Sequence, residues 1–232
     1  MPMSDPVTIG TAVVAFIEPH EGEARAFNAW YERDHFYAAA MAGPGMYAGA
    51  RWVATRACKA VRPARTLFGD PARGSYLATY WLLPDHQAEW DEWVARAYAA
   101  TPPERLFAGR DHVHTAVYAC TADARTVDAP APATALDHGF AGLIAIATTG
   151  DASAFTALVG PDLPLALVFQ AERTILTTTD PKTHRLVLAF TPIDPLHAWD
   201  RVARVIERDP LVGFASPFLR TIPGTDAYVD EL

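Results

Sequence analysis

The alternation of apolar and polar residues predicts a regular series of strands and helices in the first half of the chain. Apolar, β-branched runs predict strands, and apolar residues at three- and four-residue spacing predict helices. The predicted strands cover residues 7–16, 46–55, 75–83 and 112–120, and the predicted helices cover residues 21–40 and 84–99. The resulting order, β-α-β-β-α-β, is that of a ferredoxin-like unit.

The second half repeats this order in shorter form. Residues 121–139 are rich in Ala, Pro, Thr and Asp, lack apolar periodicity and are typical of a linker. Beyond them, a shift of 109 residues places Leu77 on Leu186 and Trp81 on Phe190. The predicted strands of this half cover residues 140–148, 163–174, 184–191 and 214–222. The second copy therefore retains the strands but shortens the first helix and the long loop.

These patterns predict an α+β fold made of two tandem ferredoxin-like (βαββαβ) repeats, the second one shortened. The first repeat covers residues 1–120, the linker 121–139 and the second repeat 140–232. A ferredoxin-like unit covers one sheet face with helices and leaves the other face open, and that face must be buried. If the two open faces pack together into one barrel, we expect a small-molecule cavity between the sheets.

The helix predicted at residues 21–40 carries unusual side chains on its apolar face. The residues of this face recur at helical spacing: Phe27, Trp30, Tyr31, Asp34, His35 and Ala38. An ordinary core helix has Leu or Ile where Asp34 and His35 stand. A histidine beside a carboxylate is suited to general acid or base catalysis, because its pKa lies near neutral pH. The alternative is a histidine that only stabilises the end of the helix.

A second group of candidate residues lies on the strand predicted at residues 112–120. Alternation places His112, His114 and Tyr118 on one face, where the two imidazoles would meet His35. Three histidines near a carboxylate are also a plausible shell for Zn²⁺ or Fe²⁺. Because three separate elements would have to supply the ligands without a spacing motif, we expect no metal. The alternative for the strand is that only His114 faces inward.

Basic residues are concentrated between positions 51 and 73, where six Lys or Arg accompany a single acidic residue, Asp70. Such a loop over a cavity could clamp a carboxylate or phosphate, although its arginines could equally be solvated. Aromatic residues nearby are candidates for the cavity wall: Trp30, Tyr47, Trp52, Tyr80 and Trp81. They favour an aromatic or polycyclic ligand.

Composition excludes several functional classes. The 232 residues carry a net charge of −8, which argues against nucleic-acid binding, and 50% of them are hydrophobic, enough for a core. No apolar run reaches the roughly 18 residues of a membrane span, and two cysteines are too few for a disulfide framework. The N-terminus has no signal-peptide pattern. We expect a cytoplasmic protein with a small-molecule substrate, capable of forming a homodimer through its outer edges.

Two segments resemble a known superfamily. FNAWYERDH at residues 27–35 and GPGMYAGARW at residues 43–52 resemble patterns of dimeric α/β-barrel proteins, near the EthD-like and polyketide-cyclase-like members, and SYLATY at residues 75–80 resembles a strand of that family. The family's usual proline after the histidine is missing here. The resemblance covers about the first 120 residues and implies the barrel fold with His35 in its cavity. Members include cofactor-free cyclases, monooxygenases, dehydratases and haem enzymes, so the reaction is implied only weakly.

Together these observations predict an acid/base enzyme of the lyase, cyclase, hydratase or isomerase type that requires no cofactor. Its substrate would be a small aromatic or polycyclic anion. His35 would transfer the proton, Asp34 would orient or charge it, and Tyr31 or His114 would be the second donor. The expected substrate contacts are Trp30, Tyr47, Arg51, Tyr80, His112 and Tyr118. Two alternatives stay open: an oxygenase (cofactor-free, metal-dependent or haem-dependent), or a non-catalytic EthD-like ligand-binding accessory protein.

Overall fold

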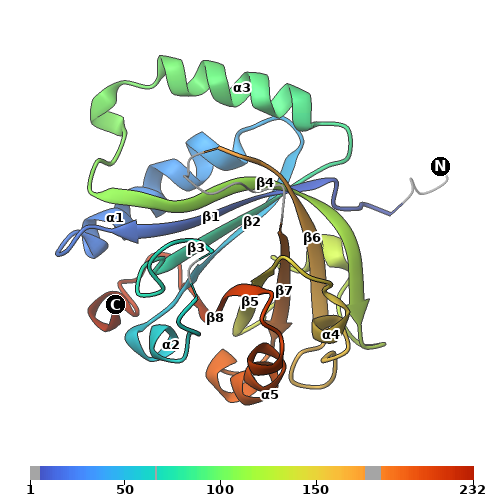
Figure 1. The fold of residues 1–232 in the computed structure, drawn as a ribbon. Helices are drawn as coiled ribbons and strands as arrows, with labels where there is room; N and C mark the ends of the chain where they lie inside the picture. The colour runs from blue at the N-terminus through green and yellow to red at the C-terminus, as the bar shows by residue number, and fades with distance from the viewer. Residues whose placement is uncertain (1–5, 66, 176–183) are drawn as a thin grey trace.

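Eight antiparallel strands close into one barrel in the computed structural model, which describes residues 6–65, 67–175 and 184–232 (Figure 1). The strands are β1 (Thr11–Pro19), β2 (Met46–Val53), β3 (Tyr76–Leu82), β4 (Arg110–Arg125), β5 (Gly142–Thr148), β6 (Leu165–Thr174), β7 (Arg185–Thr191) and β8 (Val212–Arg220). Their order around the barrel is β1-β3-β2-β8-β5-β7-β6-β4. Each half of the chain thus contributes four neighbouring strands. The structure is an α+β barrel, as predicted.

Helices cover the outside of this barrel on two sides. The α-helices are α1 (Ala24–Trp30), α2 (Arg56–Ala60), α3 (Gln87–Ala100), α4 (Ser153–Thr156) and α5 (Pro195–Arg208). The π-helix η1 (Tyr31–Met41) continues α1, and the 3₁₀ turns are η2 (Pro103–Arg105), η3 (Pro132–Thr134) and η5 (Val229–Glu231). In Figure 1, α3 runs above the barrel and α5 lies below it. None of the described helices is long and apolar enough to cross a membrane.

The observed elements agree closely with the apolar periodicity, with two differences. The helix predicted at residues 21–40 is α1 followed by η1, so most of it is wound as a π-helix. Strand β4 runs on to Arg125, five residues into the segment predicted as a linker. Those five residues are mostly exposed, but their backbone pairs with β6 from Ala122 to Arg125. Because both faces of this segment are exposed, its side chains lack the apolar alternation that identifies a strand, and the sequence did not predict the extension.

The interior of the barrel is a packed aromatic core, and this overturns the expected cavity between the sheets. Trp52 stands 5.8 Å from Phe190 and Trp81 5.4 Å from Phe169, measured between ring centroids. All four side chains are fully buried. Because aromatic side chains this large occupy both inner faces, the halves meet through packing, and the two cavities described below lie outside the barrel.

The basic segment between β2 and β3 is held in place by its own arginines. Arg62 is buried and donates hydrogen bonds to the carbonyl oxygens of Pro71, Arg73 and Gly74 and to the Ser216 hydroxyl. Arg65 donates to three carbonyl oxygens around the end of α5 and the start of β8, those of Ile206, Asp209 and Val212. These guanidinium groups satisfy acceptors of the protein itself, so Arg62 and Arg65 are not the solvated or ligand-binding arginines of this segment.

Candidate functional site

An aromatic cavity of ≈ 550 Å³ lies between the helix layer of the first half and the outer face of its strands. Its floor is formed by Val13, Ala15 and Ile17 of β1, and its cover by α1, η1 and α3. The volume falls in the range of small-molecule sites. The lining is mainly apolar and aromatic, with a few polar side chains: Tyr31, Asp34, His35, Tyr80, Tyr98, Thr101, Arg105, Arg110, His112 and Thr115.

One wall of the aromatic cavity is the helix face predicted from the sequence. Trp30, Tyr31, Asp34, His35 and Ala38 all line it, which confirms that they share a face. The His35 imidazole stacks on the Trp30 indole with 4.4 Å between ring centroids, and meets the edge of Tyr31 at 4.8 Å. Burial, and then the nearby charge of Arg110, lower the pKa of His35 to about 3. At neutral pH His35 is therefore uncharged, and it becomes an effective proton acceptor when a negative charge forms beside it and stabilises the imidazolium.

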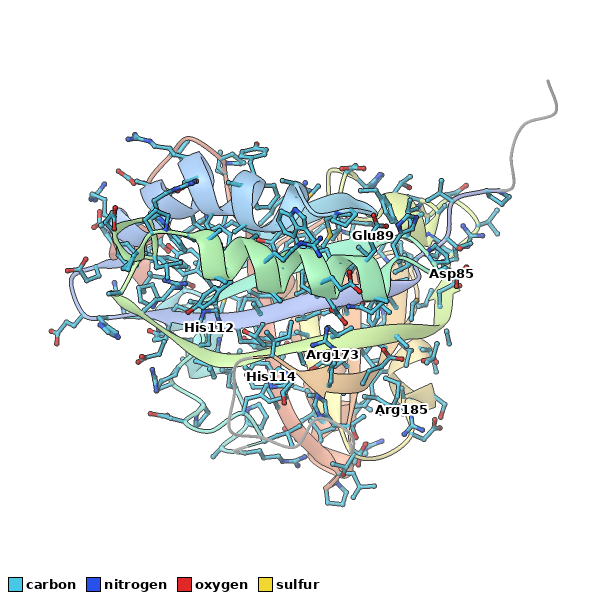
Figure 2. All side chains as sticks on the ribbon, turned by 90° about the horizontal axis from the view of Figure 1, so that it is seen from above. Asp85, Glu89, His112, His114, Arg173 and Arg185 are labelled. Carbon is cyan, nitrogen blue, oxygen red and sulfur yellow. The ribbon has the colours of Figure 1, made fainter. Side chains whose placement is uncertain are left out.

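His112 reaches the same cavity because β1 and β4 are offset by a bulge. Phe16 pairs with His114, but Ile17 pairs with His112, so the register shifts by one residue between them. A bulge redirects side chains. His112 consequently lies on the helix side, whereas His114 lies in the barrel interior (both are labelled in Figure 2). The prediction that His112, His114 and Tyr118 share one face is therefore wrong.

A hydrogen bond orients His112 within the aromatic cavity. Its Nδ1 atom lies 2.9 Å from the hydroxyl oxygen of Thr115, which is also part of the lining. This contact leaves Nε2 as the ring nitrogen available to a ligand. Burial, followed by the charge of Arg110, lowers the pKa of His112 to about 4. The cavity thus holds two neutral imidazoles.

Arg110, which the sequence argument did not select, supplies the positive charge beside these imidazoles. Its guanidinium carbon lies 4.5 Å above the Trp30 ring centroid, a cation–π contact. Its Nε atom is buried and has no hydrogen-bond partner among the described residues. A guanidinium that lacks a carboxylate partner in an apolar cavity is suited to an anionic ligand or to charge formed during a reaction.

Asp34 lies at the rim of the aromatic cavity, where its carboxylate contacts Arg105. Its carboxylate forms an ion pair with Arg105, whose Nε lies 3.2 Å from Oδ2. The Trp30 indole nitrogen donates to the backbone oxygen of the same arginine at 2.9 Å. No hydrogen bond joins Asp34 to His35 in the described structure. Asp34 therefore acts on His35 only through its charge, while the pair with Arg105 ties the helix to the segment after α3.

Tyr31 and Tyr80 form a buried pair of phenols at the edge of the aromatic cavity. Their hydroxyl oxygens are 2.6 Å apart. Burial raises the pKa of both, so both keep their protons at neutral pH. One hydroxyl donates its proton to the other in this hydrogen bond. The proton of the second hydroxyl has no acceptor among the described residues. The guanidinium carbon of Arg51 lies 4.3 Å from the Tyr31 ring centroid, on the side of η1 away from His35's cavity.

Two predicted site residues, His114 and Tyr118, lie inside the barrel together with His184. Tyr118 is hydrogen-bonded to Nε2 of His114 at 2.7 Å and to Nε2 of His184 at 2.8 Å. All three are fully buried and do not line the aromatic cavity. Tyr47 packs against the barrel core, where burial raises its pKa. His184, absent from the predicted set, carried no motif that marked it.

The histidines do not gather into a metal shell within the part of the chain that the structure describes. There, no group of three or more His, Cys, Asp or Glu side chains is placed to hold an ion. The bulge explains why His35, His112 and His114 do not come together: it places His112 and His114 on opposite faces of β4.

Comparisons with known proteins support the fold. The chain matches no family model and no curated protein sequence. Among solved structures, it is similar to an anthrone oxidase-like protein (TM-score 0.60, 8% identity, 94% of this chain and 95% of the other). It is also similar to a protein from Fusobacterium nucleatum subsp. nucleatum provisionally assigned as a monooxygenase (TM-score 0.52, 6% identity, 92% of this chain and 93% of the other). At such low identity the likeness concerns the fold alone.

Proposed function

We propose that the protein is an oxygenase that works without a redox cofactor on an aromatic compound bound in the aromatic cavity. The observation that carries this proposal is the pair of neutral imidazoles, His35 and His112, held in an apolar cavity beside the Arg110 guanidinium. A neutral imidazole can accept a proton from carbon if the negative charge that forms beside it stabilises the imidazolium, and a fixed cation can stabilise that negative charge. The resulting carbanion can then react with dioxygen itself.

The proposed reaction converts an activated methylene group into a ketone. His35 accepts the proton from carbon, and the negative charge spreads onto the substrate oxygen, close to Arg110. Dioxygen adds to the carbanion, and loss of water leaves the carbonyl: R₂CH₂ + O₂ → R₂C=O + H₂O. The carbon loses four electrons and dioxygen gains four. His35 returns its proton to the terminal oxygen of the peroxide. The remaining C–H bond and the O–O bond then break, the second proton leaves with the terminal oxygen as water, and the enzyme ends in its starting state.

The Tyr31–Tyr80 pair is suited to hold the substrate oxygen in this reaction. Because one of its two protons lacks an acceptor among the described groups, the pair can donate a hydrogen bond into the cavity. Tyr31 is the better placed of the two, since its ring contacts the His35 imidazole. A donor beside the base would stabilise the oxyanion as the proton leaves carbon.

The names of the similar structures favour oxygenation over proton transfer alone. One is called anthrone oxidase-like and the other is provisionally a monooxygenase. Anthrone is a tricyclic aromatic ketone with an activated methylene group, which matches the chemistry inferred from the cavity. The lyase, cyclase, hydratase or isomerase interpretation uses the same base but consumes no dioxygen, so dioxygen uptake separates the two.

The test is to supply anthrone to the purified protein and follow dioxygen uptake and anthraquinone formation together. We expect one dioxygen consumed per anthrone, and one ¹⁸O atom from ¹⁸O₂ in the product. Heat-denatured protein measures spontaneous oxidation, and His197→Ala, at an exposed position on α5, is the control for His35→Ala. Anthrone loss without dioxygen uptake, or binding without conversion, would refute oxygenation. Loss of activity with a metal chelator would refute independence from cofactors.

We also infer that the two halves are copies of one ferredoxin-like unit. Both contribute their strands in the same order, β4-β1-β3-β2 and β8-β5-β7-β6. Strand β7 begins and ends 109 residues after β3 (185 − 76 and 191 − 82), the shift found in the sequence. The first helix of the second copy is reduced to α4, four residues long. The copies would then differ mainly in the helix layer, which holds the proposed site.

A further inference from the structure

A second cavity, of ≈ 510 Å³, lies on the other side of the helix that carries His35. We call it the tail cavity, because residues 220–226 form one of its walls, opposite α1, η1 and β2. The helix residues Asn28, Glu32 and Phe36 face it, whereas Trp30, Tyr31 and His35 face the aromatic cavity. One helix therefore separates two cavities of similar size and different polarity.

The tail cavity contains a buried guanidinium whose hydrogen bonds are incomplete. The Arg51 side chain is only 4% exposed, and its Nη1 lies 3.2 Å from Oε1 of Glu32. The second carboxylate oxygen of Glu32 accepts a hydrogen bond from the Gly224 backbone at 2.7 Å. Both oxygens of Glu32 are thus in use, and Nη2 of Arg51 has no hydrogen-bond partner within the described residues. The guanidinium also lies against the rings of Phe27, Tyr31 and Tyr76, and these cation–π contacts offset part of the cost of its burial. An acceptor supplied by a ligand would satisfy the N–H groups that the rings do not.

The rest of the wall adds positive charge in a protein whose net charge is −8. Arg33 is exposed and makes no ion pair among the described residues. Arg220 donates to the carbonyl oxygens of Leu136 and His138, so no carboxylate offsets its charge by direct contact. Asp226 is already paired with Arg25. The cavity therefore presents more cations than anions to an incoming ligand.

Apolar side chains complete the site and set the type of anion. Phe36, Tyr37 and Ala50 line the tail cavity beside the arginines, and Phe36 also contacts Tyr80 with 5.5 Å between ring centroids. Phe36 thus stands between the two cavities. We propose that the tail cavity binds a small organic carboxylate, with its carboxylate on Arg51 and its apolar body on Phe36. This site is independent of the proposed oxygenation.

The experiment uses 4-fluorobenzoate as the probe and measures its affinity by calorimetry and ¹⁹F NMR. We expect Arg51→Lys to weaken binding about tenfold or more, because lysine cannot offer two parallel N–H groups to a carboxylate. Arg33→Gln should weaken binding a few-fold and reduce its salt dependence, because an exposed charge is screened. Arg96→Gln, at an exposed arginine of α3, is the matched control and should leave affinity unchanged.

The outcomes separate this site from the aromatic cavity. His35→Ala should bind 4-fluorobenzoate with wild-type affinity while losing anthrone turnover, so failure of one proposal leaves the other standing. Absence of binding to the wild type, or wild-type affinity in both arginine variants, would overturn the proposal. Displacement of the probe by an equal concentration of inorganic phosphate would overturn the organic part of it. Thermal melts establish that each variant is folded, and Arg33→Gln tests the site if Arg51→Lys does not fold.

Discussion

Helices α3 and α5 hold corresponding places in the two halves of the barrel but serve different purposes. Each follows the third strand of its half and each is 14 residues long. Five residues of α5 are buried: Pro195, Ala198, Trp199, Val202 and Ile206. In α3 only Trp90 is buried. The buried side chains of α5 pack directly against the strands of the second half, whereas α3 covers the aromatic cavity.

The difference shows how a repeated scaffold can yield space for a ligand. A helix that does not fill the groove below it gives up dispersion contacts and burial, so its half loses stability locally. Polar contacts hold α3 instead: Gln87 accepts a hydrogen bond from Thr11 at 2.6 Å, and Asp91 forms an ion pair with Arg173, labelled in Figure 2. The second half therefore has the more closely packed helix, and the first half holds the cavity in which we propose the chemistry.

Replacement of His35 tests the proposed role of the first half, which holds the aromatic cavity, and we expect it to have the largest effect on activity. We expect His35→Ala to lower kcat/KM for anthrone by about 10²- to 10⁴-fold, the usual contribution of a positioned base. Tm should fall only slightly, because the change loses the ring contacts of His35 with Trp30 and Tyr31 but leaves the core of the barrel intact. The measurement pairs steady-state dioxygen uptake with a thermal melt. Retention of more than half the activity would remove His35 from the reaction.

Valine replacements at matched positions test the packing side. Val202 of α5 is fully buried, and Val94 of α3 lines the aromatic cavity. We expect Val202→Ala to cost about 2–3 kcal/mol of unfolding free energy, because it leaves a void in a filled core. Val94→Ala should cost less than about 1 kcal/mol, because the space beside it is already empty. Urea titrations of both variants measure the difference, and equal costs would contradict the comparison.

The fold was predictable from sequence because apolar periodicity reports burial, and nearly every strand has a buried face. Residues 76–82 and 185–191 lie within the predicted strands, and the shift of 109 residues between them appears in both sequence and structure. The exposed end of β4 was missed because its pairing with β6 depends on backbone hydrogen bonds, which leave no trace in side-chain pattern.

The candidate site was predictable only in part, and the reason is register. The helix face from Trp30 to Ala38 follows from local spacing alone and appears as predicted. Whether His112 or His114 meets His35 depends on a one-residue bulge between distant strands, which alternation cannot foresee. Arg110 was missed for a similar reason: its importance comes from its position over Trp30, a residue 80 positions earlier in the chain.

The acid limit of activity tests the charge that Arg110 brings to the cavity, with an effect of intermediate size. A base works in its neutral form, and the pKa values of about 3 for His35 and about 4 for His112 predict a rate that stays constant from pH 8 down to about 5. Arg110 lowers both values, so Arg110→Gln should move the acid limit to higher pH, toward the ordinary value for histidine. Arg96→Gln is the control, and an unmoved limit would contradict this account.

The same histidines predict how stability responds to acid. Their pKa values in the folded protein lie below the ordinary value of 6.5, so between about pH 6.5 and 4 the unfolded chain binds more protons than the folded one. Unfolding free energy should therefore fall as pH falls through this window. A double variant with His35 and His112 both changed to Gln should show a shallower decline in urea titrations at stepped pH. An unchanged slope would mean that other groups carry the dependence.

The smallest effect is expected at the rim, where α3 is connected to the helix of the site. Asp34 pairs with Arg105 in a position open to solvent, and such pairs add little to stability because water already solvates both charges. Asp34→Asn should therefore leave Tm unchanged and reduce kcat/KM less than about tenfold, since base catalysis depends on His35. Arg105→Gln should match it, and the double variant should be no worse than either single one. A loss as large as that of His35→Ala would instead show that the carboxylate orients the imidazole during turnover, and that the rim closes further when substrate binds.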